Sequence, residues 1–239
     1  MDATMASAAV LKALDELRNG RFVLVYDADG REEETDMVVA SESVTPAVIR
    51  VLRKDAGGLI CTTADVRVQE ALGLPFLSEL FLGMAEHYPI MQKLTPNDIP
   101  YDVKSAFGIT INHRKTFTGI TDDDRALTIT EFASLAKRAL SSEDGWAKTE
   151  FGKNFRAPGH VHLLNTSNRI LETRFGHTEL ATALVIMAGL VPSATVCEMM
   201  GDNGKALSKE KARDYARAQG YVFLEGADIV AAWKERKGG

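Results

Sequence analysis

The chain has 239 residues, of which 45% are hydrophobic and 26% are charged, and its formal net charge is −5. These are ordinary values for a globular protein with a sizeable core, and the acidic balance argues against nucleic acid as the main partner. The two cysteines, Cys61 and Cys197, can form neither a disulfide framework nor a zinc-ribbon spacing, which indicates a reduced, cytoplasmic protein. No apolar stretch is long enough for a membrane span, and residues 1–10 lack the pattern of a signal peptide.

Hydrophobic periodicity predicts helices and strands along the whole chain. Helices are expected over 8–18, 45–54, 65–72, 130–140, 178–189, 208–219 and 226–237. Strands are expected over 22–26, 37–40, 59–63, 103–112, 160–164, 170–172, 194–199 and 221–224. Residues 141–158 are polar and contain glycine, which predicts a long loop. Because no repeat or linker divides the chain, we expect one α+β domain over residues 1–239, with a mixed sheet flanked by helices.

The most unusual segment follows the first predicted strand. Six carboxylates fall within the ten residues from 27 to 36, and Arg31 is the only cation among them. If the second strand begins by Glu32, side-chain alternation places Glu32, Glu34 and Asp36 on one face, where each raises the pKa of the others. A hard divalent metal, which takes oxygen ligands, would relieve this repulsion. A solvated acidic hairpin is the alternative interpretation.

A second candidate element, residues 174–179, has the sequence Arg-Phe-Gly-His-Thr-Glu and begins a strongly apolar helix. The unsatisfied N–H groups of a helix N-terminus can hold a phosphate. Gly176 would allow close approach, Thr178 adds a hydroxyl donor, and Arg174 adds a forked cation. His177 could offer a neutral nitrogen to a metal. Simple helix capping would explain the same residues.

Two further residues could transfer protons. His160 follows the turn formed by Pro158-Gly159 and is as compatible with a structural role as with a catalytic one. Glu198 lies near the end of an apolar strand, where burial would raise its pKa and suit it to proton transfer. If Glu198 is exposed instead, no such role follows.

Together, these elements resemble 3,4-dihydroxy-2-butanone 4-phosphate synthase, an enzyme family of riboflavin biosynthesis. The matching segments are 27–36, Thr118-Gly119 with Asp124-Arg125, 156–160, 174–179 and Cys197-Glu198. The resemblance implies conversion of D-ribulose 5-phosphate into L-3,4-dihydroxy-2-butanone 4-phosphate and formate. It also implies a divalent metal and a homodimer with active sites near the subunit interface. Many relatives carry a GTP cyclohydrolase module with a cysteine-rich zinc site, and this chain lacks those cysteines, so a monofunctional form is expected.

Carried over by motif position, the resemblance implies roles for individual residues. Glu32 and His177 would be the protein ligands of Mg²⁺ or Mn²⁺, with one or two ions in the site. His160 and Glu198 match residues that the family needs for catalysis. Arg31 and Asp36 would contact the sugar. The full set of implied substrate contacts is Arg31, Glu32, Asp36, Asp27, Thr118, Arg174, Gly176, His177, Thr178 and Glu198.

The implied reaction removes a proton from C1, forms an enediol, loses water, migrates a carbon and expels C4 as formate. A divalent ion stabilises an enediolate as a Lewis acid. Crowded carboxylates such as Glu34 and Asp36 have pKa values shifted toward working pH, but spacing does not show which of them takes the C1 proton. Glu198 and His160 would act later.

Glu33, on the opposite face of the predicted strand, is expected to have no role. Two other functions fit the residues less completely. One is a metal-dependent sugar-phosphate isomerase or aldolase that uses the same enediol chemistry. The other is a non-catalytic metal-binding or phosphate-binding module.

Overall fold

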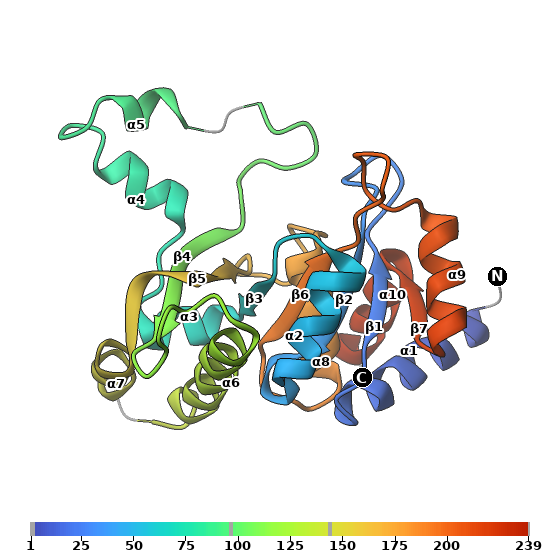
Figure 1. The fold of residues 1–239 in the computed structure, drawn as a ribbon. Coiled ribbons are helices and arrows are strands. Elements are labelled where there is room, and N and C mark those ends of the chain that lie inside the picture. Colours follow the sequence, from blue (N-terminus) through green and yellow to red (C-terminus); the bar gives the residue numbers. More distant parts are fainter. Residues whose placement is uncertain (1–2, 96–97, 143–144, 239) are drawn as a thin grey trace.

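A seven-stranded sheet runs through the computed structural model, which describes residues 3–95, 98–142 and 145–238 (Figure 1). Its strands are β1 (Val23–Tyr26), β2 (Thr35–Ala40), β3 (Cys61–Ala64), β4 (Phe107–His113), β5 (Phe155–Asn165), β6 (Ala194–Glu198) and β7 (Val222–Glu225). They lie in the order β4-β5-β3-β6-β2-β1-β7. The pairs β1/β7 and β3/β5 are parallel and the other four pairs are antiparallel. The predicted α+β class with a mixed sheet is therefore confirmed.

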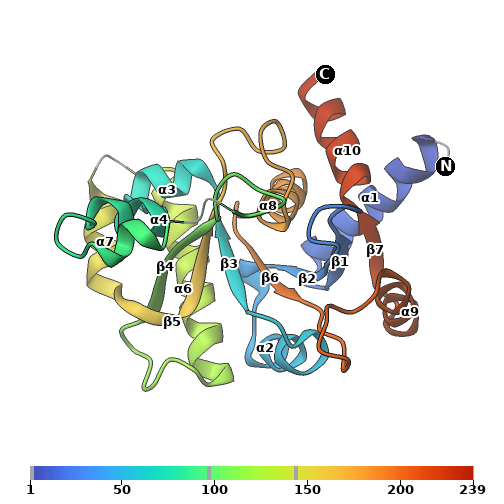
Figure 2. The same ribbon diagram turned by 90° about the horizontal axis from the view of Figure 1, so that it is seen from above.

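Helices cover both faces of this sheet (Figure 2). They are α1 (Ala3–Arg18), α2 (Pro46–Val51), α3 (Val66–Leu72), α4 (Leu77–Gly83), α5 (Ile90–Lys93), α6 (Asp122–Ala139), α7 (Trp146–Asn154), α8 (His177–Met187), α9 (Lys209–Gln219) and α10 (Gly226–Gly238). A π-helical turn, Leu52–Ala56, prolongs α2. Helices α1, α8 and α10 pack on one face, and α2, α3, α6, α7 and α9 pack on the other.

The alternation of side chains along the strands separates two hydrophobic cores. In the central strands Leu24 and Met37 belong to the core under α2 and α6. Val25 and Val38 belong to the core under α8. All four side chains are fully buried. Polar residues at the ends of these strands that point to the same face as Val25 and Val38 therefore lie beside the beginning of α8.

The acidic segment differs from its prediction. Strand β2 begins at Thr35, so Glu32 and Glu34 lie in the connecting loop and not in an extended strand. Glu33 has a φ of 58°, which interrupts the extended alternation on which the prediction rested. Its carboxylate accepts the N–H of Gly30 at 2.8 Å, so Glu33 stabilises the loop.

Residues 141–158 are not a long loop, because α7 and the beginning of β5 lie there. Ala147 is buried, and Phe151 and Phe155 form an aromatic cluster with Phe132 of α6. Three apolar anchors spaced four residues apart are enough to dock the segment, although the residues between them are polar. The expected strand over 170–172 is also wrong: Ile170 makes only an isolated bridge, to Arg174.

Two other predicted elements begin at different residues. Helix α6 begins at Asp122, eight residues before its predicted start, because Thr121 caps it by accepting the N–H of Asp124 at 3.1 Å. The strand expected from residue 103 begins at Phe107. The remaining predicted helices and strands are present with ends shifted by a few residues.

Helices α4 and α5 project from the β4 end of the molecule (Figure 1). Neither helix contains a buried residue. The chain then returns through residues 98–106 to β4, and on the way Tyr101 and Asp102 reach the cavity described below. No helix in the described ranges is long and apolar enough to cross a membrane.

Candidate active site

A cavity of about 630 Å³ lies where the acidic loop, the end of β6 and the beginning of α8 meet. Its polar lining consists of Arg31, Glu32, Glu34, Asp36, Tyr101, Asp102, Lys104, Ser105, Arg174, His177, Thr178 and Glu198. Apolar side chains from residues 99–107, β5 and β6 complete the wall. The two sequence segments that were expected to form halves of one site therefore meet in one cavity.

Sheet register explains why two of the carboxylates are neighbours. Asp36 in β2 is directly opposite Glu198 in β6, and directly opposite Val25 in β1 on its other side. Opposite residues in antiparallel strands project to the same face. Helix α8 packs on that face, which brings His177 to within 3.7 Å of Asp36 (Nε2 to Oδ1).

Glu32 and His177 contact each other directly. Oε2 of Glu32 lies 3.0 Å from Nδ1 of His177, and Nε2 of His177 lies 3.2 Å from the carbonyl oxygen of Val25. Because a carbonyl only accepts, Nε2 carries a hydrogen, and Nδ1 is the nitrogen that contacts Glu32. Once Nδ1 loses its proton it can bind a metal, while the bond to Val25 fixes the orientation of the ring.

The protonation of this pair follows from its contacts. Burial opposes charge on Glu32, but the hydrogen bond and charge of His177, together with Arg31, lower the pKa of Glu32 to about 2. The pKa of His177 is raised to about 9, because Asp36, Glu32 and Asp27 outweigh the effect of burial. Mutual elevation of the pKa values was expected for the acidic segment, and for Glu32 the structure shows the opposite.

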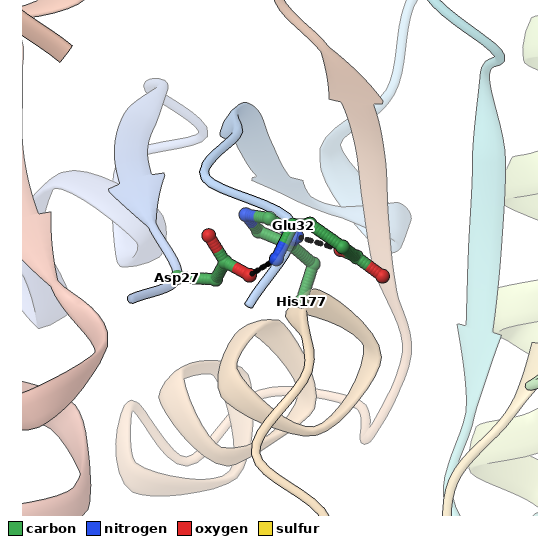
Figure 3. Close-up of side chains that lie close together, drawn as sticks. All are labelled: Asp27, Glu32 and His177. Carbon is green, nitrogen blue, oxygen red and sulfur yellow. Dashed lines mark hydrogen bonds and ion pairs between the residues drawn. The ribbon is translucent and has the colours of Figure 1, made fainter. Parts of the chain in front are cut away.

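Asp27 organises the acidic loop from its position immediately after β1. Its two oxygens accept the N–H groups of Glu32 at 2.9 Å and Glu34 at 3.2 Å, and Arg31 Nη1 lies 3.0 Å from Oδ2. Figure 3 shows Asp27 and Glu32, from the loop between β1 and β2, close to His177 at the beginning of α8, and the ligand atoms of the three residues all lie within 4.8 Å of one another. This group of two carboxylates and an imidazole is able to hold a metal ion.

Asp36 and Glu34 are the carboxylates whose pKa is raised. Burial, with the charges of Glu198, Glu32 and Glu34, raises the pKa of Asp36 to about 8 despite the opposing charge of His177. Its Oδ1 is buried and finds no hydrogen-bond partner among the described residues. Glu34 is half-buried, and burial together with the charge of Glu32 raises its pKa. A raised pKa brings a carboxyl group closer to neutral pH, which suits it to proton transfer.

The two arginines of the site converge at the beginning of α8. Gly176 is the N-cap residue, and a Cβ at this position would lie 2.5 Å from Arg31 Nη2 and 2.7 Å from Arg174 Nη1. Only glycine leaves room for both guanidinium groups. Glu179, fully buried in the first turn, contacts Arg174 Nη1 at 2.5 Å and accepts the N–H of Ser167 at 2.9 Å. Glu179 therefore fixes Arg174.

Glu198 is held by the backbone that precedes β3. Its Oε2 accepts the N–H of Leu59 at 2.7 Å, and its side chain packs against Gly58 so closely that a Cβ there would collide with it. Glu198 is half-buried and lines the cavity beside Val196. One carboxylate oxygen is thus anchored by the protein.

His160 and Thr118, which the resemblance also placed in the site, do not line this cavity. His160 is exposed on β5, where its Nδ1 lies 3.1 Å from Nδ2 of Asn112. Asn112 also contacts the carbonyl oxygen of Thr118 at 3.4 Å. The side chain of Thr118 is exposed beside Asp124, which accepts its N–H. The structure therefore brings His160 and Thr118 to the same residue, Asn112, and leaves both outside the cavity of their own chain.

Sequence reasoning missed several residues of the site, among them Asp102, Tyr101 and Glu179. Asp102 and Tyr101 lie in a segment to which no element was assigned, and their contribution depends on where the chain returns to β4. Glu179 was part of a matching motif, but no role was given to it. A carboxylate in the first turn of an otherwise apolar helix was the available signal, because a buried charge requires a partner.

Comparison with known proteins agrees with this geometry. The family model of 3,4-dihydroxy-2-butanone 4-phosphate synthase matches residues 11–232. A curated synthase from Methanothermobacter thermautotrophicus is 48% identical over 227 residues, covering 95% of this chain and 96% of the relative. A synthase from Methanosarcina mazei is 43% identical over 225 residues, covering 93% of this chain and 90% of the relative.

Solved structures lead to the same family. The structure of a 3,4-dihydroxy-2-butanone 4-phosphate synthase in complex with two magnesium ions superposes with a TM-score of 0.73 at 26% identity, covering 96% of this chain and 98% of that chain. The chain belongs to the 3,4-dihydroxy-2-butanone 4-phosphate synthase family, whose members convert D-ribulose 5-phosphate into L-3,4-dihydroxy-2-butanone 4-phosphate and formate in riboflavin biosynthesis.

Proposed function

We propose that this chain performs the family reaction in the cavity beside α8, with Glu32 and His177 as the protein ligands of a divalent metal. The observation that carries the proposal is the pairing of these two side chains at 3.0 Å next to the buried Asp36 and the two arginines. A metal-binding pair, a candidate proton carrier and a phosphate-sized cationic site then share one cavity. We further propose that residues 1–239 form one domain, because strands from residue 23 to residue 225 join one sheet.

The donor set fits a hard divalent cation. Glu32 offers a carboxylate oxygen and His177 offers Nδ1, with Asp27 close to both. Few protein ligands and several free positions are typical of Mg²⁺, while an imidazole ligand is more usual for Mn²⁺. Two ions, as in the solved relative, are compatible with the surrounding carboxylates. When bound, the metal would supply Lewis-acid stabilisation of the enediolate.

The phosphate of the substrate would bind at the beginning of α8. Arg174 provides a planar fork of donors, Gly176 keeps the backbone accessible, and Thr178 lines the cavity beside them. Arg31 and Asp36 lie closer to the metal ligands and would contact the sugar hydroxyls, with Asp27 holding Arg31 in place. Binding energy from the remote phosphate would then orient the reacting carbons.

The proton transfers would be shared by carboxylates with different surroundings. Asp36 is fully buried and Glu34 is half-buried, and the pKa of each is raised. We assign the C1 and hydroxyl proton transfers to these two residues. Glu198, with one oxygen anchored by Leu59, would present the other oxygen to the substrate in the later stages.

His160 and Thr118 would reach a site only from a second copy of the chain. Both are exposed, both are linked to Asn112, and neither lines the cavity of its own chain. We therefore propose a homodimer in which each copy places its His160 group at the other copy's cavity. A cytoplasmic location, expected from the reduced cysteines, stays a prediction.

The proposed function is tested by incubating the protein with D-ribulose 5-phosphate and Mg²⁺ or Mn²⁺ and measuring formate. Formate and a four-carbon phosphate, identified by carbon NMR, are the expected products. A pentulose or pentose phosphate without formate would instead show an isomerase. No turnover by folded, metal-loaded protein would reject the proposal.

A further inference from the structure

Asp102 lies between the two arginines of the site. Its Oδ2 is 2.5 Å from Nε of Arg174 and 3.2 Å from Nη2 of Arg31. Its side chain is only 8% exposed, although it belongs to the irregular segment that leads to β4. One carboxylate oxygen thus contacts two guanidinium groups from distant parts of the chain.

The position occupied by Asp102 is built for an anion. Arg31 and Arg174 are both pressed against Gly176 at the beginning of α8, so two positive charges lie next to the positive end of a helix dipole. Each arginine has a carboxylate of its own, Asp27 for Arg31 and Glu179 for Arg174, and the carboxylate of Asp102 contacts both. A single oxygen that accepts from Nη2 of one arginine and Nε of the other has the contacts that one phosphate oxygen would make.

The other carboxylates that contact these arginines are anchored differently. Asp27 and Glu179 also accept backbone N–H groups, from the acidic loop and from Ser167 respectively. Glu32, whose Oε2 lies 3.0 Å from Nη1 of Arg31, is paired with His177. These carboxylates are therefore part of the fixed structure of the site. Among the described residues, Asp102 in contrast uses Oδ2 for the arginines alone, and its Oδ1 accepts only the N–H of the next residue, Val103. Within the part of the chain that the structure describes, the hydrogen bonds of Asp102 outside its own segment are therefore limited to the two arginines.

The segment that carries Asp102 separates two cavities. Residues 99–102 line the active-site cavity and also a second cavity of about 470 Å³ on the side of Thr173 and Phe175. Tyr101 lies over the guanidinium of Arg31, with its ring centroid 5.5 Å from Cζ. If Asp102 leaves the arginines, residues 99–102, which separate the two cavities, move with it.

We propose that Asp102 is an internal substitute for the substrate phosphate. In the free enzyme its carboxylate occupies the anion position between Arg31 and Arg174, and the substrate binds by displacing it together with residues 99–102. This inference rests on the proposed function, because it takes Arg174 as part of the phosphate site. The displaced state is the binding-competent one, so the apparent affinity for phosphate is reduced by the fraction of molecules in which Asp102 is bound.

The test is calorimetric titration of the full-length protein with inorganic phosphate. Removing the charge in Asp102→Asn should tighten phosphate binding by about tenfold, the size of one charge-assisted contact. Asp102→Ser repeats the measurement should the amide variant fold poorly. Unchanged or weaker phosphate binding in the folded variants would overturn the proposal, because Asp102 would then support the arginines and not compete with the ligand.

Two further variants complete the experiment. Asp98→Asn makes the same change of charge at an exposed position of the same segment and should leave phosphate affinity within about twofold. Arg174→Gln should weaken phosphate binding both in the parent protein and in Asp102→Asn. If Arg174→Gln does not change phosphate affinity, the phosphate site of the proposed function is wrong. If Arg174→Gln weakens phosphate binding but Asp102→Asn does not tighten it, only the proposal that Asp102 substitutes for phosphate is rejected.

Discussion

The Oε2 atom of Glu32 lies 3.0 Å from Nδ1 of His177, although 145 positions separate the two residues in the chain. Without a metal the pair is an ion pair, because the pKa of Glu32 is lowered to about 2 and that of His177 is raised to about 9. A divalent cation would take the place of the proton on Nδ1. Metal binding and proton release should therefore be coupled at this site.

The first prediction concerns this coupling. Titration of the metal-free protein with Mn²⁺ at pH 7–8 should release protons, measured by calorimetry in buffers of different ionisation enthalpy. Glu32→Ala and His177→Ala should each weaken Mn²⁺ binding by about 100-fold or more, since loss of an outer-shell partner alone costs 10–100-fold. Glu33→Gln, which changes a neighbouring charge outside the cavity, is the matched control. Parental Mn²⁺ affinity in His177→Ala would exclude the histidine as a ligand.

The second prediction concerns the stability of the metal-free protein. The pKa of Asp36 is raised from 3.8 to about 8, so between these values the folded state holds a proton that the unfolded state loses. The contribution of Asp36 to the free energy of unfolding therefore falls as pH rises above 3.8. Asp36→Asn removes this dependence and should be more stable than the parent by about 1–3 kcal/mol at pH 6.5, with the difference shrinking toward pH 4.

Urea unfolding at pH 4, 5 and 6.5 measures this difference. The comparison stops at pH 6.5 because His177, whose pKa is raised to about 9, adds its own loss of stability above its unfolded value of 6.5. Asp214→Asn, which alters an exposed carboxylate, should show no comparable trend. A difference between Asp36→Asn and the parent that is the same at all three pH values would contradict the buried, protonated state of Asp36.

The third prediction concerns the room that Gly176 leaves for the arginines. In Gly176→Ala the new Cβ would lie 2.5 Å from Arg31 Nη2, so at least one guanidinium must move. The backbone itself is not strained, because φ at this position is −83°. We expect the KM for ribulose 5-phosphate to rise about tenfold or more while the melting temperature changes little. Gly152→Ala, where a Cβ meets nothing within 4 Å, is the control.

Periodicity predicted the elements whose burial is regular. Helix α8 is apolar over most of its length and β6 is buried through Cys197, so both were recognised with nearly correct bounds. Helix α7 was missed because only Ala147 is buried within it, and its docking depends on aromatic residues of other elements. Tertiary packing decided that segment, and no local pattern reports it.

The site was predictable to the extent that its residues lie in dense local motifs. The acidic segment and the beginning of α8 each contain several functional groups in ten residues or fewer, so their meeting in one cavity could be expected. The prediction that Glu32, Glu34 and Asp36 share a strand face was wrong, yet all three line the cavity because Asp27 folds the loop back over it. Asp102 could not be found, since its neighbours in the chain give no indication of where it lies.

The last prediction tests the exchange of residues between copies. His160→Ala and Glu198→Gln should each lose at least about 100-fold in kcat when assayed alone, as expected for groups that transfer protons. In a dimer that contains one copy of each variant, one site would combine the intact Glu198 of the first copy with the intact His160 of the second. The other site would lack both groups.

Co-expression of the two variants with different affinity tags allows this mixed dimer to be purified. A dimer with one intact site should recover about half of the parental activity, because closed two-fold symmetry gives two equivalent sites. A mixed dimer of Glu32→Ala and Glu198→Gln is the control, since both residues line the cavity of one chain and every site stays damaged. Should the His160→Ala and Glu198→Gln dimer stay as inactive as this control, His160 would not act across the interface.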